Sequence, residues 1–162
     1  MAGIEEDMVT AQESKPPAIP PTAVVKRAFA IRSRMRRLAD AMLPPQGIAA
    51  ERTFLLAEIK MLEVVCELEV AEAIDGGRTG APAIAQHVGA DPDATERVLR
   101  FLASRGWFVR KRDGTYRLNA RSRALRADDP QSLRDWVRFM GADWHWTIWN
   151  EASRAVRTGG SA

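Results

Sequence analysis

Residues 89–118, GADPDATERVLRFLASRGWFVRKRDGTYRL, constrain the fold more than any other stretch of this chain. Asp91 is placed to cap a helix, and Pro92 suits the first helical position. The apolar residues on one side of this helix are Val98, Leu99 and Leu102. Gly106 ends the helix, so the stretch predicts a capped helix of about three to four turns.

The second half of the same stretch predicts a β-hairpin. Apolar and polar residues alternate after Gly106, and the pair Asp113-Gly114 is the strongest short signal for a hairpin turn. A helical stretch at 47–74 and a short helix at 81–89, for which Thr79 is placed as a cap, precede it. The order of helix, short helix, capped helix and hairpin predicts a mainly α winged helix-turn-helix fold with a small β-hairpin.

The apolar face predicted for the 47–74 helix consists of Leu55, Ile59, Leu62, Val65 and Cys66. Acidic residues make its other side negative. Cys66 is the single cysteine, so no internal disulfide is possible, and we interpret it as a small core residue in a protein of the reducing cytoplasm.

The N-terminal part divides into a proline-rich, disordered leader at 1–23 and a helix at 24–47. The helix carries a narrow apolar seam at alternating steps of four and three residues, formed by Val24, Ala28, Ile31, Met35, Leu38 and Met42. Such a seam predicts packing against another helix, and Ile31, Met35 and Leu38 are the candidates for a dimer contact. An ordinary amphipathic helix on its own domain remains the alternative. The seam lacks the Trp and Phe side chains that favour a membrane surface.

The charge balance excludes a strongly basic protein, since 24 Lys and Arg face 21 Asp and Glu. Apolar runs are shorter than the ~20 residues of a membrane span, so we expect a cytoplasmic protein without membrane contact.

Residues 48–160 resemble the N-terminal dimerisation region of small-molecule S-adenosylmethionine-dependent O-methyltransferases, the plant phenolic and bacterial polyketide-tailoring type. The motifs that carry the resemblance are GADPDATERVLRFLASRG, DGTYRLN, and SLRDWVRFMG with two later tryptophans leading to RTG. The resemblance implies that 48–126 form a winged-helix dimerisation domain. It also implies that 127–162 connect to a methyltransferase domain that we expect to lie outside this chain.

The same resemblance implies a homodimer, or pairing with a separate methyltransferase-domain chain. It implies S-adenosylmethionine and a small aromatic or polyketide-like acceptor for the complete enzyme. The Gly-x-Gly-x-Gly turn of a nucleoside-binding strand is missing, so we expect the chain to bind no cofactor and no metal and to hold no catalytic residue. His87 is interpreted as a helix-end or surface residue.

The C-terminal aromatic residues are interpreted in two groups. Trp136 and Trp144 are expected in the core. The candidates for a substrate pocket or an interface are Met140, His145, Trp146 and Trp149. Plain core packing is the alternative for Trp146 and Trp149. A short helix that is apolar on two sides is normally covered by two layers, and the second layer would be a partner or another domain.

A winged-helix DNA-binding regulator is the rival interpretation. Ten Lys and Arg residues lie between Arg97 and Arg126, against one acid, Asp113. Three acids, Asp91, Asp93 and Glu96, open the helix that would meet base edges, and phosphates repel them. We therefore do not expect nucleic-acid binding, and we interpret the basic run as a solvated face or as the complement of the acidic residues at 63–74.

Overall fold

The computed structural model describes residues 21–161 as two units, with the division after Ile48. The first twenty residues of the predicted leader lie outside the described residues. Helix α1 (Thr22–Asp40) begins two residues before the predicted start at Val24.

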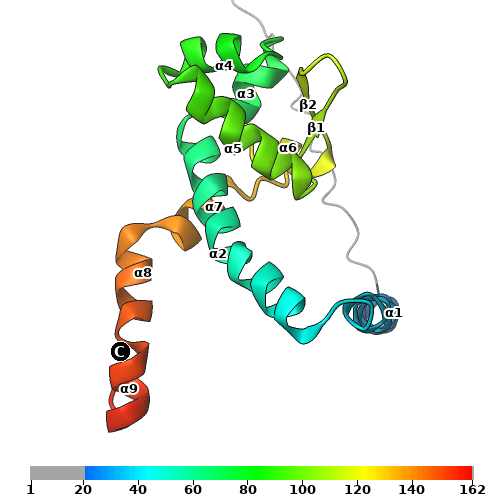
Figure 1. Ribbon diagram of the computed structural model, residues 1–162, viewed down its shortest axis with the longest axis vertical. Coiled ribbons are helices and arrows are strands. Elements are labelled where there is room, and N and C mark those ends of the chain that lie inside the picture. Colours follow the sequence, from blue (N-terminus) through cyan, green and yellow to red (C-terminus); the bar gives the residue numbers. More distant parts are fainter. Residues whose placement is uncertain (1–20, 162) are drawn as a thin grey trace, which may run out of the picture. The chain divides into compact units, whose positions relative to one another are not determined.

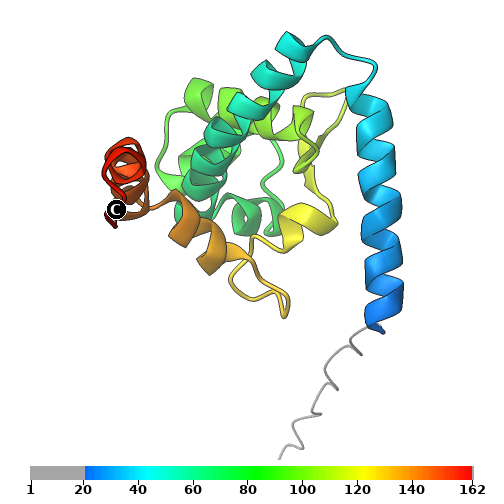
Figure 2. The same ribbon diagram turned by 90° about the horizontal axis from the view of Figure 1, so that it is seen from below.

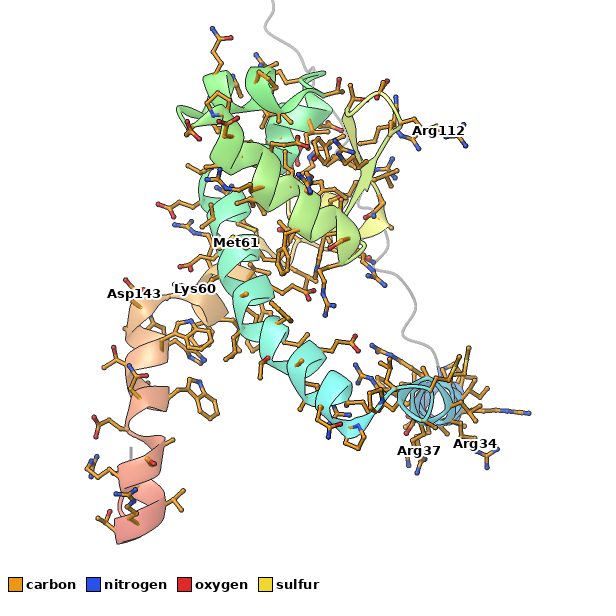
Figure 3. The ribbon with its side chains drawn as sticks, viewed as in Figure 1. Arg34, Arg37, Lys60, Met61, Arg112 and Asp143 are labelled. Atoms are coloured by element: carbon orange, nitrogen blue, oxygen red, sulfur yellow. The ribbon has the colours of Figure 1, made fainter. Side chains whose placement is uncertain are left out.

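Helix α1 leaves its apolar seam in solvent. Met35 is 66% exposed and Leu38 is 71% exposed. Met42 lies past the end of the helix, which stops at Asp40. Six basic residues lie on α1, and Figure 3 shows two of them, Arg34 and Arg37, projecting from it. The seam therefore has the spacing of a packed helix but contacts no core of its own unit.

The predicted helix at 47–74 is two helices, which corrects the prediction of one continuous stretch. Helix α2 (Pro45–Glu67) ends before Glu69, whose φ of 54° is left-handed, and α3 (Val70–Asp75) follows. The change in direction at Glu69 gives α3 a different orientation from α2, and Val70, Ala71, Ala73 and Ile74 are all buried. Burial of these side chains offsets the cost of a left-handed glutamate, about 1–3 kcal/mol.

The helix-turn-helix follows the sequence closely, apart from one cap. Helix α4 (Ala81–Val88) starts from Gly80, and the predicted cap Thr79 is wrong. The Thr79 carbonyl accepts from the Tyr116 N–H at 2.7 Å and so joins the start of α4 to the hairpin. Helix α5 (Pro92–Ser104) is capped as predicted, since Asp91 Oδ1 accepts from the Ala94 N–H at 2.7 Å.

The hairpin consists of β1 (Phe108–Arg110) and β2 (Tyr116–Leu118), paired antiparallel with Phe108 opposite Leu118. Its turn forms at the predicted Asp113-Gly114 pair. Gly114 has a φ of 82°, and Asp113 Oδ1 accepts from the Thr115 N–H at 2.9 Å. The fold class predicted from the sequence, mainly α with a small winged hairpin, is confirmed.

The C-terminal part is helical: α6 (Ala120–Arg123), α7 (Arg134–Gly141), α8 (Asp143–Asn150) and α9 (Ala152–Thr158). Helices α3, α4 and α5 and the hairpin gather together in Figure 1 and in Figure 2, whereas α8 and α9 extend away from them in Figure 1 and lie to one side, nearly end-on, in Figure 2.

The core lies within the winged helix and the C-terminal half of α2. Its completely or almost completely buried side chains are Val65, Cys66, Ile84, Leu99, Leu102, Tyr116 and Leu125. Cys66 is therefore the core residue that the sequence predicts, and burial raises the pKa of its thiol to about 11. Among residues 21–161, no helix combines the length and the apolar character that a bilayer crossing requires.

Candidate functional site

An apolar hollow of about 410 Å³ lies between α2 and the α7–α8 segment. We call it the aromatic hollow. It is lined by Leu56, Ile59, Met140, His145, Trp146 and Trp149. The structure thus brings together all four residues that the sequence suggested for a pocket or an interface. A volume of this size lies in the range of small-molecule pockets.

Two residues of the aromatic hollow were not predicted as part of a site. Ile59 was assigned to the core face of its helix, but it is half-buried at the wall of the aromatic hollow. Leu56 lies off that predicted face and is mostly exposed. The only sequence signal for this wall is the extra width of the apolar run around Leu55 and Leu56.

A hydrogen bond within α8 orients the aromatic side of the aromatic hollow. The Trp149 indole N–H donates to His145 Nε2 at 3.0 Å. The imidazole also lies 5.2 Å from the Phe139 ring centroid and 5.8 Å from that of Trp144. These contacts fix the direction of His145.

Trp136 and Trp144 are not core residues, which corrects the prediction. Their side chains are 61% and 54% exposed. Trp136 stacks on Phe139 at a centroid distance of 5.7 Å, and Phe139 meets Trp144 edge to face at 5.0 Å. The rings contact one another instead of the core because α7 buries only Val137 and Gly141, and α8 buries no side chain fully.

A lysine joins α2 to the corner between α7 and α8. Lys60 Nζ donates to Glu63 Oε2 at 2.7 Å, to the Gly141 carbonyl at 2.5 Å and to Asp143 Oδ1 at 3.3 Å. We call Lys60, Glu63, Gly141 and Asp143 the lysine clamp; Figure 3 labels Lys60 on α2 and Asp143 at the start of α8. The hydrogen bond with Glu63, followed by that with Asp143, raises the pKa of Lys60. The sequence offered no local signal for the contact of Lys60 with the corner between α7 and α8, because 81 residues separate Lys60 from Gly141.

Two of the ten basic residues between Arg97 and Arg126 pair with acids of α2 and α3. Arg105 pairs with Glu58 at 2.8 Å, and Glu58 also accepts from the Trp107 indole N–H at 2.6 Å. Arg126 pairs with Asp75 at 2.7 Å. Neither acid lies in the stretch 63–74 that the sequence suggested as the complement of the basic run, where Glu69 and Glu72 pair with Arg134 instead.

A basic groove remains on the outer face of α5 and β1. It measures about 750 Å³ and is lined by Arg97, Arg100, Phe101, Ala103, Ser104 and Arg110. Arg110 pairs with Glu96 at 3.2 Å, whereas in the described part of the chain no ion pair forms at Arg97 or Arg100. Figure 3 shows Arg112 pointing outward at the tip of the hairpin.

The described residues include neither a nucleoside-binding turn nor a metal-binding cluster. The strands within residues 21–161 are the two of the hairpin, and no glycine-rich turn leads there from a parallel strand into a helix. These residues therefore do not fit a nucleoside cofactor. Within the same range, no group of three or more His, Cys, Asp or Glu could hold a metal ion. His87 is exposed at the end of α4, the surface position expected for it.

Residues 51–128 match the family model of the O-methyltransferase dimerisation domain. The chain is 35% identical over 101 residues to a mitomycin biosynthesis 6-O-methyltransferase of Streptomyces lavendulae, a match that covers 62% of this chain and 29% of that protein. It is 32% identical over 105 residues to a 2,7-dihydroxy-5-methyl-1-naphthoate 7-O-methyltransferase of Streptomyces carzinostaticus, which covers 64% of this chain and 32% of that protein.

A solved structure agrees with these sequence matches. It is an O-methyltransferase from neocarzinostatin biosynthesis in complex with S-adenosylmethionine and 2-hydroxy-5-methyl naphthoic acid. The TM-score is 0.55 at 32% identity, over 64% of this chain and 32% of that one. The chain thus spans about a third of the length of the relatives that it matches.

Proposed function

We propose that this chain, whose residues 51–128 match the family model of the O-methyltransferase dimerisation domain, pairs with a second copy of itself and supplies one wall of an acceptor pocket. The complete enzyme would be an S-adenosylmethionine-dependent O-methyltransferase, and this chain would contribute assembly and substrate contact without catalysis of its own. The observation that carries the proposal is the gathering of Met140, His145, Trp146 and Trp149 around one hollow.

The exposed seam of α1 supports the homodimer. Ile31, Met35 and Leu38 follow one another at helical spacing and are all more than half exposed. Apolar side chains in a row cost free energy in water, about 25 cal/mol for each Å² that a partner would cover. A second copy offers the same seam, so the contact would be symmetric. A separate methyltransferase-domain chain is the other partner that could cover it.

The composition of the aromatic hollow supports a flat acceptor. Two indole rings, an imidazole and three aliphatic side chains make a wall suited to aromatic rings, which stack or meet edge to face. The Trp146 Nε1–H is buried and has no hydrogen-bond partner among the described residues. A substrate oxygen that accepts a hydrogen bond from this N–H would remove the cost of an unpaired buried donor, about 1–3 kcal/mol. A small aromatic or polyketide-like substrate offers both a flat ring and such an oxygen. We also propose a cytoplasmic location for the complete enzyme.

Sedimentation equilibrium of a seam variant tests the homodimer. The variant Ile31→Gln, Met35→Gln, Leu38→Gln removes the apolar seam, and we expect the dimer dissociation constant to rise at least about a hundredfold, or ~2.7 kcal/mol. The control Ser33→Gln, Arg34→Gln, Arg37→Gln changes the same helix off the seam and should leave the constant within about threefold. An unmodified chain that stays monomeric at tens of micromolar, or a seam variant that still dimerises, contradicts the proposal.

A winged-helix DNA-binding regulator is the second candidate, and the basic groove with Arg97 and Arg100 favours it. The exposed acids Asp91 and Asp93 at the start of α5 weigh against it. Fluorescence anisotropy with a labelled 30-base-pair duplex decides between the two. Binding at 50 mM salt that weakens steeply by 200 mM would support the regulator, and no binding at 50 mM would exclude it.

A further inference from the structure

The two walls of the aromatic hollow come from helices that the chain does not join nearby. Leu56 and Ile59 belong to α2, whereas His145, Trp146 and Trp149 belong to α8. Helix α8 has no fully buried side chain, so apolar packing gives it little stability. The distance between the walls therefore depends on the contacts that hold the corner between α7 and α8.

The lysine clamp provides such contacts at one end of the aromatic hollow. Lys60 follows Ile59, and Gly141 follows Met140, so each partner of the Lys60–Gly141 hydrogen bond is next to a residue of the wall. Gly141 is the last residue of α7, where carbonyls have no partner within the helix and the helix dipole is negative. The ammonium group satisfies that carbonyl and also reaches Asp143 in the first turn of α8.

Glu63 completes the lysine clamp by steric contact. A Cβ atom at position 141 would lie 2.6 Å from the Cβ, Cδ and Oε2 atoms of Glu63, so only glycine allows this approach. Glu63 also accepts from Lys60 at 2.7 Å and directs the ammonium group toward α7. Helix α2 therefore holds the corner between α7 and α8 both by the hydrogen bonds of Lys60 and by the close packing of Glu63 against Gly141.

We propose that Lys60 is a positioning residue that fixes the corner between α7 and α8 against α2 and so sets the width of the aromatic hollow for a flat aromatic ligand. This inference rests on the proposed acceptor-pocket function. Lys60 does not line the aromatic hollow itself and acts through the placement of Met140, His145 and the two tryptophans.

The exposure of the partners predicts how the three contacts share this work. The Asp143 side chain is fully exposed and 3.3 Å from Lys60, so water and salt screen this contact strongly. The Glu63 side chain is 21% exposed, and its contact is shorter. The bonds to Gly141 and Glu63 therefore carry most of the positioning, and the bond to Asp143 carries the salt-sensitive remainder.

Binding of 2-naphthol, a neutral aromatic probe, to the full chain tests the inference through quenching of tryptophan fluorescence. We expect Lys60→Gln to raise the dissociation constant about tenfold, and Asp143→Asn less than about threefold. Lys60→Arg keeps a donor in reach and should restore binding to within about threefold. Lys111→Gln, on the hairpin loop, is the matched control and should bind as the unmodified chain does.

Hydrogen exchange of backbone amides separates positioning from general stability. In Lys60→Gln we expect faster exchange at 144–150 in α8, unchanged exchange in α5, and a thermal midpoint lowered by less than about 3 °C. Binding and α8 exchange equal to those of the unmodified chain would overturn the proposal, as would faster exchange spread equally over α5 and α8. A chain that binds no 2-naphthol contradicts the acceptor pocket, and the exchange of α8 then decides the positioning role alone.

Discussion

Two leucines show how differently the parts of this chain complete their packing. Leu99 on α5 is 0% exposed and Leu38 on α1 is 71% exposed, although both lie on the apolar side of an amphipathic helix. The winged helix covers its own apolar faces with α3, α4, the hairpin and the C-terminal half of α2. Helices α1 and α8 present theirs to solvent. The winged helix therefore packs its apolar side chains within the chain, whereas the exposed apolar faces of α1 and α8 have the character of contact surfaces.

The largest expected effect comes from emptying a core position. Leu99→Ala should lower the free energy of unfolding by about 2–5 kcal/mol, because it removes buried methyl groups and leaves a cavity in a closed core. Urea denaturation followed by circular dichroism measures the loss. A loss below about 1 kcal/mol would mean that the winged helix does not pack its core as tightly as the structure shows.

The thiol of Cys66 gives a second comparison between the two regions. Burial raises the pKa of Cys66 from 9.0 to about 11, so the folded chain should hold about a hundredfold less thiolate at pH 8 than an exposed cysteine does. Labelling with Ellman's reagent should be slower by at least that factor in the folded chain than in guanidinium. Adding Leu38→Cys on α1 should add one equivalent that reacts at the rate of a free thiol.

The same shift has a consequence for stability at high pH. The folded-state pKa of Cys66 lies above the unfolded value, so the protonated thiol is the form that the fold favours. Its contribution is fully present below pH 9 and is lost as the pH rises toward 11. Equal labelling rates at pH 8 for the Cys66 thiol and for the thiol added by Leu38→Cys would contradict the distinction between the two regions.

Removal of the α5 cap should have a smaller effect. Asp91→Ala leaves the Ala94 N–H without its side-chain acceptor and should lower the free energy of unfolding by about 1 kcal/mol in thermal denaturation. Asp91→Asn keeps an acceptor oxygen and should stay within about 0.5 kcal/mol of the unmodified chain. Equal losses in both variants would show that charge, and not the hydrogen bond, stabilises this helix end.

The smallest change in unfolding free energy is expected for Leu38→Ala, the exposed counterpart of Leu99→Ala. Leu38→Ala deletes the same atoms as Leu99→Ala, but from an exposed site, so the free energy of unfolding of the winged helix should change by less than about 0.5 kcal/mol. Urea denaturation, at a protein concentration below the dimer dissociation constant, measures this change in unfolding free energy without a contribution from dimer formation. A loss comparable to that of Leu99→Ala would mean that the seam of α1 packs within the same chain.

Local chemistry made the winged helix predictable. The cap at Asp91 and the turn at Asp113-Gly114 each depend on residues within three or four positions, and both form as the sequence indicates. The break at Glu69 could not be predicted, since no glycine or proline interrupts that stretch. There the burial of Val70 and Ile74 determines the backbone. Propensity gives way to tertiary packing at such a position.

The candidate site was predictable only in part. Helical spacing and aromatic content singled out Met140, His145, Trp146 and Trp149, which the structure places around one hollow. The same reasoning failed for Trp136 and Trp144, because a tryptophan indicates that a surface is covered but not that this chain covers it. The role of Lys60 could not be predicted, because two of its partners, Gly141 and Asp143, lie more than 80 positions away and a lysine on a helix normally faces water.

The contact between Gly141 and Glu63 has a consequence for how such chains can diverge. A methyl group at 141 collides with Glu63, while a shorter side chain at 63 would leave Lys60 without its closest carboxylate. Neither position tolerates change alone, so we expect substitutions there to occur together or be lost. Positions 63 and 141, which are 78 residues apart, would then covary among related sequences. Such covariation in an alignment would indicate the contact at the corner between α7 and α8 without a structure.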